Sequence, residues 1–322
     1  MIVVTGSNGF IGSNLIFQLN QRGVKDILAV DDLSKKDQIA NLTHCEIEDL
    51  VDINDFYPNL DNNLLKEKKV KTIFHQGACS DTMEWDALFI LENNYLLAKK
   101  LLDCAEKTKI PFIYASSASV YGDGKIFIEE KENEKPINLY AYSKYLFDQY
   151  VRSRIEKSSS QIVGLRYFNV YGPNEFHKSK MASVVHHLHQ QLKNDQSVKL
   201  FEASGGYAAG EQRRDFVHVD DVVKVNLWFR ENNNISGIFN VGTGESQTFK
   251  EVAEAVIEWN KKGSIQFIPF PKELIGSYQS FTEANLDKLR KAGYKDKFLN
   301  VQEGIKLYLD TLENWPSNEY KT

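Results

Sequence analysis

A glycine-rich turn near the N-terminus constrains the fold of this chain more than any other feature of its sequence. Gly6, Gly9 and Gly12 form a GxxGxxG pattern, which follows a short apolar run and opens a helix-like stretch. Glycines let a backbone turn tightly and approach a pyrophosphate, which then meets the unpaired N–H groups and the positive dipole end of the helix. An ordinary strand-to-helix turn is the alternative, but the position between these two elements favours a dinucleotide-binding loop.

Charged residues after the second apolar run bear on which dinucleotide binds. Asp31 stands about 20 residues beyond the loop, where a carboxylate can bond the ribose hydroxyls of adenosine. Asp31 and Asp32 repel a 2′-phosphate and favour NAD, whereas Lys35 and Lys36 can hold that phosphate and favour NADP. The two lysines also suit a solvated loop. The residues therefore leave the choice between NAD and NADP open.

Apolar, β-rich runs alternate with helix-like stretches along the first half of the chain. This alternation is typical of a parallel sheet with right-handed crossovers, so we predict an α/β fold with a Rossmann-type, doubly wound parallel sheet. The predicted strands are residues 2–4, 27–30, 70–74, 112–115 and 162–165, and the predicted helices include 11–20, 93–107 and 142–155.

The alternation of apolar runs and helix-like stretches becomes less regular after Pro173. Residues 204–210 form the clearest loop, because glycine and small residues dominate them. Two strand-like stretches follow, 215–219 and 237–241, and then a helix–loop–helix tail. We predict a dinucleotide-binding domain over residues 1–168, whose sheet the chain revisits at about 214–242, and a smaller C-terminal α/β substrate-binding domain over residues 169–322.

Composition and charge exclude several classes of protein. The net charge of -5 argues against a nucleic-acid partner, which requires a basic footprint. No apolar run approaches the roughly 20 residues of a membrane helix, and the first residues lack the basic flank and long apolar stretch of a signal peptide. Cys45, Cys79 and Cys104 are odd in number and widely spaced. We therefore expect reduced thiols in a cytoplasmic protein.

Tyr140 and Lys144 form a YxxxK pattern at the start of a predicted helix. Residues four apart share a helix face, so Lys144 is expected beside Tyr140. A neighbouring ammonium and a positive nicotinamide ring both favour the phenolate, which can accept an alcohol's proton while hydride leaves for the cofactor. A serine-rich stretch (116–119) follows a predicted strand, and one of its hydroxyls can bond the reacting oxygen. An amphipathic helix is the alternative reading of YxxxK, and Tyr142 has no lysine four residues later.

We predict no metal site. His186, His187 and His189 suggest one, but only His186 and His189 share a helix face, and no carboxylate lies at a suitable spacing.

Six motifs together resemble the extended short-chain dehydrogenase/reductase family of NAD-dependent epimerases and dehydratases, whose members act on nucleotide sugars. They are residues 6–12, 116–122, 140–144, 166–173 (RYFNVYGP), 214–222 (RDFVHVDDV) and 240–244 (NVGTG). Within this family, residues 75–86 (HQGACSDTMEWD) and 177–184 (HKSKMASV) resemble the branch that inverts C6 of an ADP-linked heptose. The likeness covers essentially the whole chain.

The resemblance implies an isomerase that converts ADP-D-glycero-β-D-manno-heptose to ADP-L-glycero-β-D-manno-heptose. It implies transient oxidation to a 6-keto intermediate, return of hydride to the opposite face, and a place in lipopolysaccharide core biosynthesis. It also implies a tightly bound nicotinamide cofactor, NADP with NAD left open, and a homo-oligomer.

The same resemblance assigns site residues. Tyr140 and Lys178 are the two acid/base groups, supported by Lys144 and by Ser117, which matches better than Ser116. Together with the glycine loop, the residues expected at the cofactor are Gly6, Gly9, Phe10, Ile11, Gly12, Asp31, Asp32, Gln76, Gly77, Ala78, Cys79, Ser80, Asn93, Lys144, Val170 and Lys178. Those expected to hold the nucleotide sugar are Asn169, Lys180, His187, Phe201, Glu202, Ala203, Ser204, Arg214 and Tyr278.

The chain departs from the family pattern in three places. Gln38 stands where a lysine is common, which weakens the NADP assignment; Lys180 replaces a small polar residue; and residues 205–213 are longer. A nucleotide-sugar 4-epimerase or 4,6-dehydratase of the same fold is the alternative function. Dehydratases generally carry an Asp-Glu pair where this chain has Ala118 and Ser119. A non-enzymatic dinucleotide sensor is a remote alternative, since it would lose YxxxK.

Overall fold

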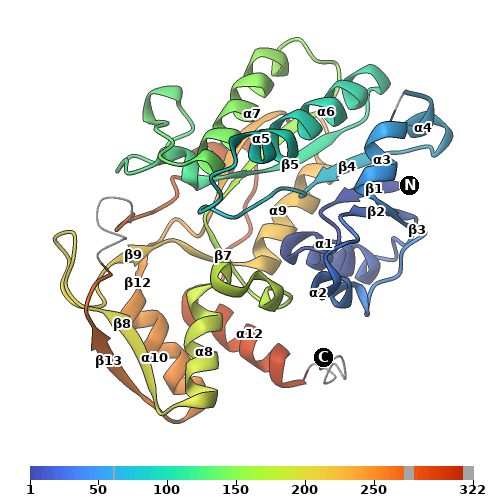
Figure 1. The fold of residues 1–322 in the computed structure, drawn as a ribbon. Coiled ribbons are helices and arrows are strands. Elements are labelled where there is room, and N and C mark those ends of the chain that lie inside the picture. The colour runs from blue at the N-terminus through green and yellow to red at the C-terminus, as the bar shows by residue number, and fades with distance from the viewer. Residues whose placement is uncertain (61, 272–278, 315–322) are drawn as a thin grey trace.

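Seven parallel strands form the central sheet, in the order β11-β6-β5-β4-β1-β2-β3 (Figure 1). The structure is a computed structural model that describes residues 1–60, 62–271 and 279–314. It confirms the predicted doubly wound parallel sheet. The strands are β1 (Ile2–Thr5), β2 (Ile27–Asp31), β3 (Asp49–Asp52), β4 (Thr72–His75), β5 (Phe112–Ser117), β6 (Ile162–Tyr167) and β11 (Gly237–Val241).

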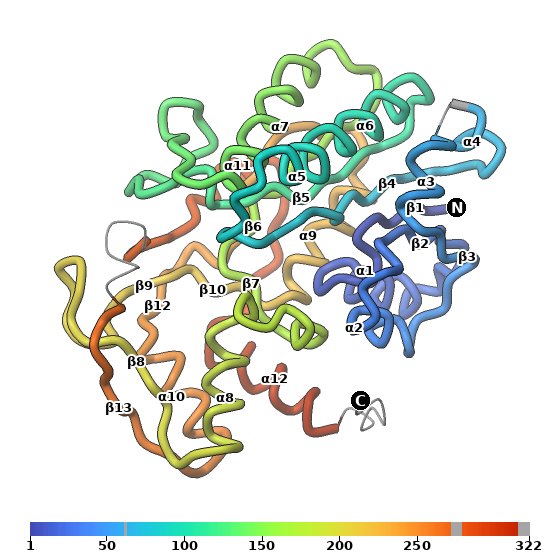
Figure 2. The backbone as a smooth tube through the Cα atoms, viewed as in Figure 1, coloured from blue at the N-terminus to red at the C-terminus, as the bar shows by residue number. Residues whose placement is uncertain are grey.

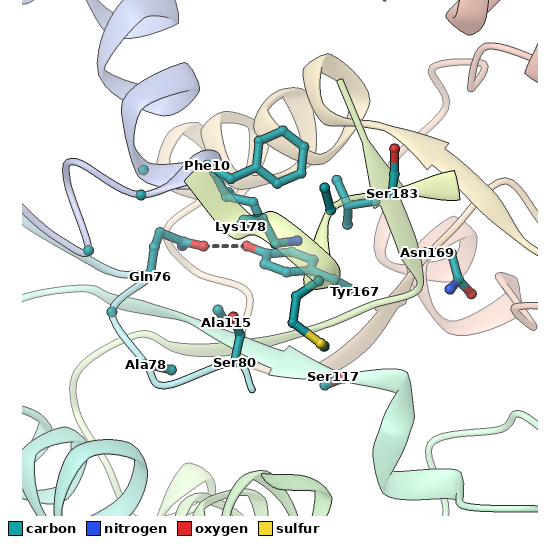
Figure 3. A pocket seen from close by; sticks show the side chains of 18 of the residues that line it. Phe10, Gln76, Ala78, Ser80, Ala115, Ser117, Tyr167, Asn169, Lys178 and Ser183 are labelled. Atoms are coloured by element: carbon teal, nitrogen blue, oxygen red, sulfur yellow. Dashed lines mark hydrogen bonds between the residues drawn. The ribbon is translucent and has the colours of Figure 1, made fainter. Parts of the chain in front are cut away.

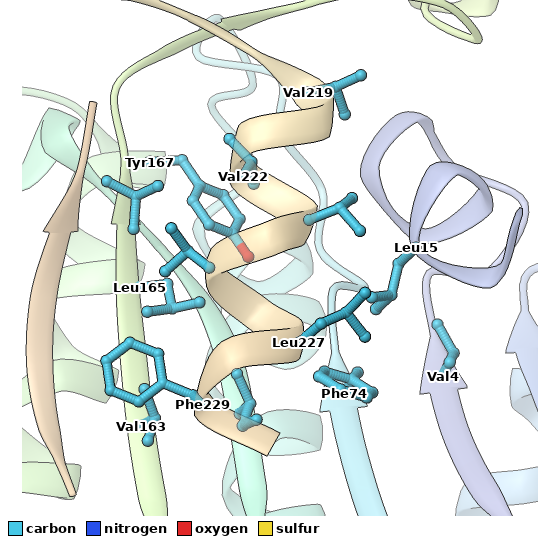
Figure 4. Close-up of a cluster of buried hydrophobic side chains, with 14 of the residues drawn as sticks. Val4, Leu15, Phe74, Val163, Leu165, Tyr167, Val219, Val222, Leu227 and Phe229 are labelled. Atoms are coloured by element: carbon cyan, nitrogen blue, oxygen red, sulfur yellow. The ribbon is translucent and has the colours of Figure 1, made fainter. Parts of the chain in front are cut away.

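Both faces of this sheet are covered by helices, because neighbouring residues of a strand point to opposite faces and, in strands such as β1, both sets are apolar. In β1, Val4 packs in one core and Val3 in the other. The first core is built with α1 (Phe10–Gln21), α9 (Val219–Glu231) and α11 (Asp287–Ala292), and Figure 4 shows Leu15 and Leu227 of the first two meeting there. The second core is built with α3 (Ile53–Asn59), α4 (Asn62–Glu67), α6 (Leu97–Thr108) and α7 (Leu139–Ile155).

The order in which strands are added to the sheet reverses between β1 and β4. From β1 the chain winds outward through β2 and β3, then returns to β4 on the other side of β1. The turns that leave β1 and β4 therefore separate at the carboxyl edge of the sheet. Ligands of such sheets bind at this switch point.

A second layer lies beside this edge, below the sheet in Figures 1 and 2. It has its own apolar core, in which α8 (Val184–Asn194), α10 (Phe249–Asn260) and α12 (Val301–Asn314) pack on strands β8 (Ser197–Phe201) and β13 (Ser264–Ile268). Two small sheets connect the layers: β7 (Asn169–Tyr171) with β10 (Phe216–His218), and β9 (Arg213–Arg214) with β12 (Gln247–Thr248). The domain boundary at residue 168 stays a prediction.

Several elements differ from the sequence-based expectation. Within residues 214–242 only β11 joins the central sheet, because β10 pairs with β7 instead. Strands β3, β8 and β13 were not predicted, since exposed or half-buried residues interrupt each of them and none is a continuous apolar run. The predicted helix 93–107 begins with a π-helical turn (η2, Glu92–Leu96), which α5 (Ala87–Leu91) precedes. The short helix α2 (Lys36–Ile39) follows β2.

Within the described parts of the chain, no helix combines the length and the apolar character that crossing a membrane requires.

Candidate active site

A cavity of about 430 Å³ opens at the carboxyl edge of the central sheet, beside the switch point. Its walls come from the glycine loop, the ends of β4 and β5, the first turn of α7, and the segment between β7 and α8 (Figure 3). The predicted site residues that line it are Gly6, Gly9, Phe10, Ile11, Gly12, Asp31, Gln76, Gly77, Ala78, Ser80, Ser117, Tyr140, Lys144, Asn169, Val170 and Lys178. The structure thus brings the four residues predicted for catalysis into one cavity with most of those predicted for the cofactor.

The glycine loop is too tightly packed for a side chain at two positions. Gly6 has a φ of +67°, and a Cβ there would lie 2.5 Å from the Gly77 nitrogen. A Cβ at Gly12 would lie 2.0 Å from the Gly6 carbonyl oxygen. Gly9 is the N-cap of α1, so no side chain caps the first turn of that helix. Because the first N–H groups of a helix lack internal partners, this end of α1 fits a pyrophosphate and hence a dinucleotide.

We expect Gly12→Ala to destabilise the protein by about 1–3 kcal/mol, as overpacking generally does, and to abolish retention of the dinucleotide. Gly9→Ala is the matched control, because its Cβ would lie 3.2 Å from the same Gly6 oxygen, a contact that a small shift relieves. Thermal unfolding measures the first effect, and mass spectrometry of nucleotide released on denaturation measures the second. Equal retention by the two variants would contradict the expectation.

Asp31 ends β2 and holds the glycine loop in place. Its Oδ2 accepts a hydrogen bond from the Asn8 N–H (2.6 Å), and its Oδ1 accepts one from the Asp32 N–H (2.8 Å). Burial raises the pKa of the carboxyl, and these two donors oppose that shift. Each carboxylate oxygen can accept a second hydrogen bond, so a ribose contact by Asp31 is still open to it.

Three further side chains line the cavity near Asp31: Lys35, Gln38 and His177. The Lys35 Nζ lies 3.7 Å from the Asp32 carboxylate, so its charge is already partly balanced. The Asn41 amide lies 3.2 Å from the Nδ1 of His177. Burial, with the charges of Lys178 and Lys35, lowers the pKa of His177 to about 4, so this ring is neutral at pH 7.

The side chain of Gln76 lines the cavity, and its polar atoms are already hydrogen-bonded to other side chains. Its Oε1 accepts a hydrogen bond from the Tyr167 hydroxyl (2.9 Å), as Figure 3 shows. Its Nε2 donates to Asn226 Oδ1 (3.2 Å). Asn226 in turn donates to Tyr167 (2.9 Å). Gln76 therefore ties the end of β4 to β6 and α9.

Ser117 and Ser116, at the end of β5, have different environments. The Ser117 hydroxyl is hydrogen-bonded to Tyr140, which favours the Tyr140 phenolate, but burial raises the pKa of Tyr140 above its usual value. Ser116 instead donates to the buried carboxylate of Asp148 (2.9 Å). Of the two serines, Ser117 is thus the one beside Tyr140.

Lys144 lies one helical turn after Tyr140 in α7. Its Nζ donates to the Ala115 carbonyl oxygen (2.9 Å), and it is almost completely buried. Burial lowers the pKa of Lys144 to about 8, although Asp148 and Cys79 favour its charged form. The pKa of Tyr140 is shifted by its burial, by Ser117 and by Cys79. Lys144 is not among these causes, so the expected activation of the phenol by Lys144 is not seen in the pKa of Tyr140.

Lys178 enters the same cavity from a different part of the chain, the 3-10 helix η5 (Phe176–Met181). Its Nζ lies 5.2 Å from the centroid of the Phe10 ring (Figure 3). Burial lowers the pKa of Lys178, and the carboxylate of Glu175 opposes that shift. A lysine with a lowered pKa exchanges protons more readily near neutral pH.

Other predicted residues lie outside this cavity. Asp32, Cys79 and Asn93 line an adjoining cavity of about 90 Å³ beyond Gly77. The Arg214 guanidinium packs over the ring of Phe249 (5.7 Å), which itself lines the main cavity. The structure does not bring these substrate-site residues into the main cavity: Lys180, His187, Phe201, Glu202, Ala203, Ser204 and Arg214. Their roles stay predictions, and Tyr278 lies outside the described residues.

Sequence reasoning missed several residues of the cavity wall. Some of them, such as Tyr167 and Ala182, belong to the motifs 166–173 and 177–184, so their motif could have drawn attention to them. Phe249 begins α10, and no motif points to it. The lining residues that were not assigned are Ala115, Ser116, Tyr167, Phe168, His177, Met181, Ala182, Ser183, Val184, Phe216 and Phe249.

Two of the histidines that could suggest a metal lie next to other partners. His186 Nδ1 lies 3.3 Å from the Tyr308 hydroxyl, and His189 Nδ1 lies 3.4 Å from the Asn260 amide. In the residues that the structure covers, no three His, Cys, Asp or Glu side chains gather where they could hold a metal ion.

The chain is similar to known proteins over nearly its whole length. It is 49% identical over 319 residues to an ADP-L-glycero-D-manno-heptose-6-epimerase of Alkalilimnicola ehrlichii, covering 98% of this chain and 99% of that protein. A crystal structure of the Helicobacter pylori ADP-L-glycero-D-manno-heptose-6-epimerase is 32% identical, with a TM-score of 0.82, and the match covers 97% and 96% of the two chains. A UDP-glucose 4-epimerase of Thermus thermophilus, solved with NAD, is 26% identical, with a TM-score of 0.76 and coverage of 98% and 99%.

The sequence pattern of one family matches most of the chain. It extends over residues 2–242, which include the glycine loop, Tyr140, Lys144 and Lys178. With this match and the long alignments above, the chain belongs to the NAD dependent epimerase/dehydratase family.

Proposed function

We propose that this protein is an ADP-L-glycero-D-manno-heptose 6-epimerase. The observation that carries the proposal is that two proton-exchanging side chains from separate elements, Tyr140 of α7 and Lys178 of η5, line one cavity with the glycine loop. The identity of 49% to a heptose epimerase supports the choice of substrate. A cytoplasmic location and a homo-oligomeric state, which the resemblance implies, belong to the same proposal.

The reaction explains why two such side chains are needed. Inverting one carbon through a ketone requires hydride to leave one face and return to the other. Because C6 is exocyclic, rotation about the C5–C6 bond presents both faces without turning the sugar ring over. The oxygen on C6 then occupies two positions, and a single acid/base group cannot easily reach both.

Tyr140 and Lys178 serve these two positions. Tyr140, hydrogen-bonded to Ser117, exchanges a proton with the oxygen in one position. Lys178, whose pKa burial lowers, exchanges a proton with it in the other. A nicotinamide dinucleotide held at the glycine loop would supply the hydride transfer, a chemistry that side chains do not supply.

The chain uses a nicotinamide dinucleotide, as its family description states. We propose that the dinucleotide is NADP. Lys35 at the cavity and the resemblance to heptose epimerases support NADP. Asp31, Asp32 and Gln38 oppose it, since none of them attracts a 2′-phosphate.

The protein is expected to purify with its dinucleotide bound and to need none added. Epimerisation is redox-neutral overall, so a cofactor reduced in the first half of the reaction is reoxidised in the second and need not leave. Mass spectrometry of the nucleotide released on denaturation identifies it, and we expect NADP. NAD alone would contradict the choice of NADP, and full activity of protein stripped of dinucleotide would contradict tight retention.

The proposed function is tested by incubating the protein with ADP-D-glycero-β-D-manno-heptose and resolving the C6 epimers by NMR. We expect both epimers at equilibrium, with no added cofactor. UDP-glucose and UDP-N-acetylglucosamine, assayed in parallel for inversion at C4, test the alternative of a 4-epimerase. Inversion of a UDP-sugar without inversion of the ADP-heptose would overturn the proposal.

A further inference from the structure

One buried carboxylate, that of Glu175, is hydrogen-bonded to both ends of the segment that carries Lys178. Glu175 lies between β7 and η5 and is fully buried. Its Oε1 accepts hydrogen bonds from the Gly172 N–H (3.3 Å) and the Ser183 hydroxyl (2.7 Å). Its Oε2 accepts one from the Ser183 N–H (2.5 Å). A single side chain thus joins the start of the segment 172–183 to its end.

The exit of this segment is fixed to a helix by the same contacts. Ser183 is the N-cap of α8, and its hydroxyl accepts a hydrogen bond from the His186 N–H while it donates to Glu175. Ser183 also lines the main cavity. Glu175 therefore connects the wall of the cavity to the first turn of α8.

Between these anchors the backbone around Lys178 is constrained. The Lys178 N–H donates to the Glu175 carbonyl oxygen (3.0 Å). The next residue, Ser179, has φ 47° and ψ −120°, a conformation that costs a non-glycine residue about 1–3 kcal/mol and persists only where the surroundings impose it. The Ala182 N–H then donates to the Ser179 carbonyl oxygen (3.1 Å). This strained turn places Lys178 at the cavity.

The charges of Glu175 and Lys178 each favour the ionised form of the other. Burial raises the pKa of Glu175, while Ser183 and the charge of Lys178 favour its ionised form. The Tyr308 hydroxyl of α12 is also hydrogen-bonded to this carboxylate. The carboxylate of Glu175 in turn favours the charged form of Lys178 and so opposes the fall in its pKa. The other ionisable side chains that line the cavity around Lys178 are Asp31, Lys35, Tyr140, Lys144, Tyr167 and His177.

We propose that Glu175 is a positioning residue, which ties the two ends of the segment 172–183 together and so holds Lys178 at its place in the cavity. Its significance for catalysis rests on the proposed function, in which Lys178 is the second acid/base group. Glu175 itself is not among the residues that line the main cavity, so it affects the reaction only through Lys178.

The test replaces Glu175 by glutamine, which keeps the shape of the side chain but loses its charge and turns one acceptor into a donor. In the protein as purified with its cofactor, Lys178 and Lys180 are acetylated competitively with acetic anhydride over a range of pH, and each modified peptide is quantified. Lys180 is exposed in the same segment and serves as the internal reference. Only the neutral amine reacts, so we expect the Lys178 curve of Glu175→Gln to move to lower pH while the Lys180 curve stays.

Turnover of the ADP-heptose adds a second readout. We expect Glu175→Gln to lower kcat by ~10- to 100-fold with little change in KM, because displacing a reacting group by about 1 Å can cost ~10²-fold. Glu175→Asp keeps the charge but shortens the side chain, so its Lys178 curve should stay near the wild-type position while kcat falls. A Glu175→Gln protein that folds with an unmoved Lys178 curve would overturn the proposal.

Where Glu175→Gln fails to fold, Ser183→Ala provides the test. It removes one anchor and keeps the carboxylate, so we expect kcat to fall by ~10-fold at unchanged KM. A lower Tm with unchanged kcat would instead show a purely structural contact and overturn the proposal. The acetylation experiment uses no substrate, so its result stands even if the ADP-heptose is not turned over, and the two failures remain distinguishable.

Discussion

Tyr140→Phe is expected to lower kcat by several orders of magnitude while the ADP-sugar still binds. General acid–base groups typically contribute ~10²–10⁴-fold, and phenylalanine removes only the hydroxyl that is hydrogen-bonded to Ser117. The fold should survive, because the aromatic ring stays in the first turn of α7. Initial rates from NMR of the C6 epimers and binding of ADP-sugar by calorimetry separate the two effects. A Tyr140→Phe protein within tenfold of the wild-type kcat would exclude Tyr140 as an acid/base group.

Lys178→Met tests whether Lys178 exchanges a proton with the C6 oxygen in its second position. Methionine keeps much of the apolar stem beside Phe10 but removes the ammonium. If Lys178 exchanges a proton with the substrate, kcat falls by a similar ~10²–10⁴-fold at nearly unchanged KM. Lys193→Met is the matched control, since Lys193 is exposed, does not line the cavity and is not a predicted site residue. A rise in KM with kcat intact would make Lys178 a binding residue, and the two-base scheme would be wrong.

Asp148→Ala is expected to destabilise the protein by about 3–5 kcal/mol, because it leaves the charge of Arg166 buried without its main partner. Asp148 and Arg166 are both fully buried. The Asp148 Oδ2 accepts from the Arg166 Nε (3.0 Å) and from the Ser116 hydroxyl (2.9 Å), and its Oδ1 accepts from the Tyr114 hydroxyl (2.8 Å). Glu134 contacts the same guanidinium, so part of the charge stays balanced in the variant. Urea unfolding at equilibrium measures the loss.

The control for this prediction is an exposed ion pair. Glu46 lies 2.7 Å from Lys25, and both side chains are more than half exposed, so Glu46→Ala should cost less than about 1 kcal/mol. A similar small loss for Asp148→Ala would show that the buried pair contributes little. Asp148 also belongs to α7, the helix that carries Tyr140 and Lys144. Loosening it should therefore lower activity as well as stability.

The central sheet, the glycine loop and the pairing of Tyr140 with Lys144 could be predicted from the sequence because their sequence patterns are local. A strand that is buried on both faces is a continuous apolar run, and β1, β2, β5 and β6 all have that form. The glycine loop is a local backbone requirement, and the spacing of Tyr140 and Lys144 places both on one turn of a helix. Strands β3 and β13 have exposed residues and no such run, so nothing in the local sequence marked them.

The tertiary structure decided what each polar side chain does. Ser116 and Ser117 are neighbours in an equivalent sequence context, yet one bonds Asp148 on the buried side and the other bonds Tyr140. Gln76 is occupied by Tyr167, a partner 91 residues away along the chain. Hydrogen bonds of this kind depend on how separate elements pack, and no local pattern encodes that packing.

For this chain, the sequence by itself determined the class of fold, the loop for a dinucleotide and the placement of Tyr140 and Lys144 on one turn of a helix, because each depends on a few neighbouring residues. The tertiary structure alone decided that Lys178 shares a cavity with Tyr140, that Glu175 joins the two ends of the segment carrying Lys178, and that Arg214 is not among the residues lining this cavity. These outcomes depend on the distances between separate elements and on the loss of water around their charges, which exist only once the chain has folded.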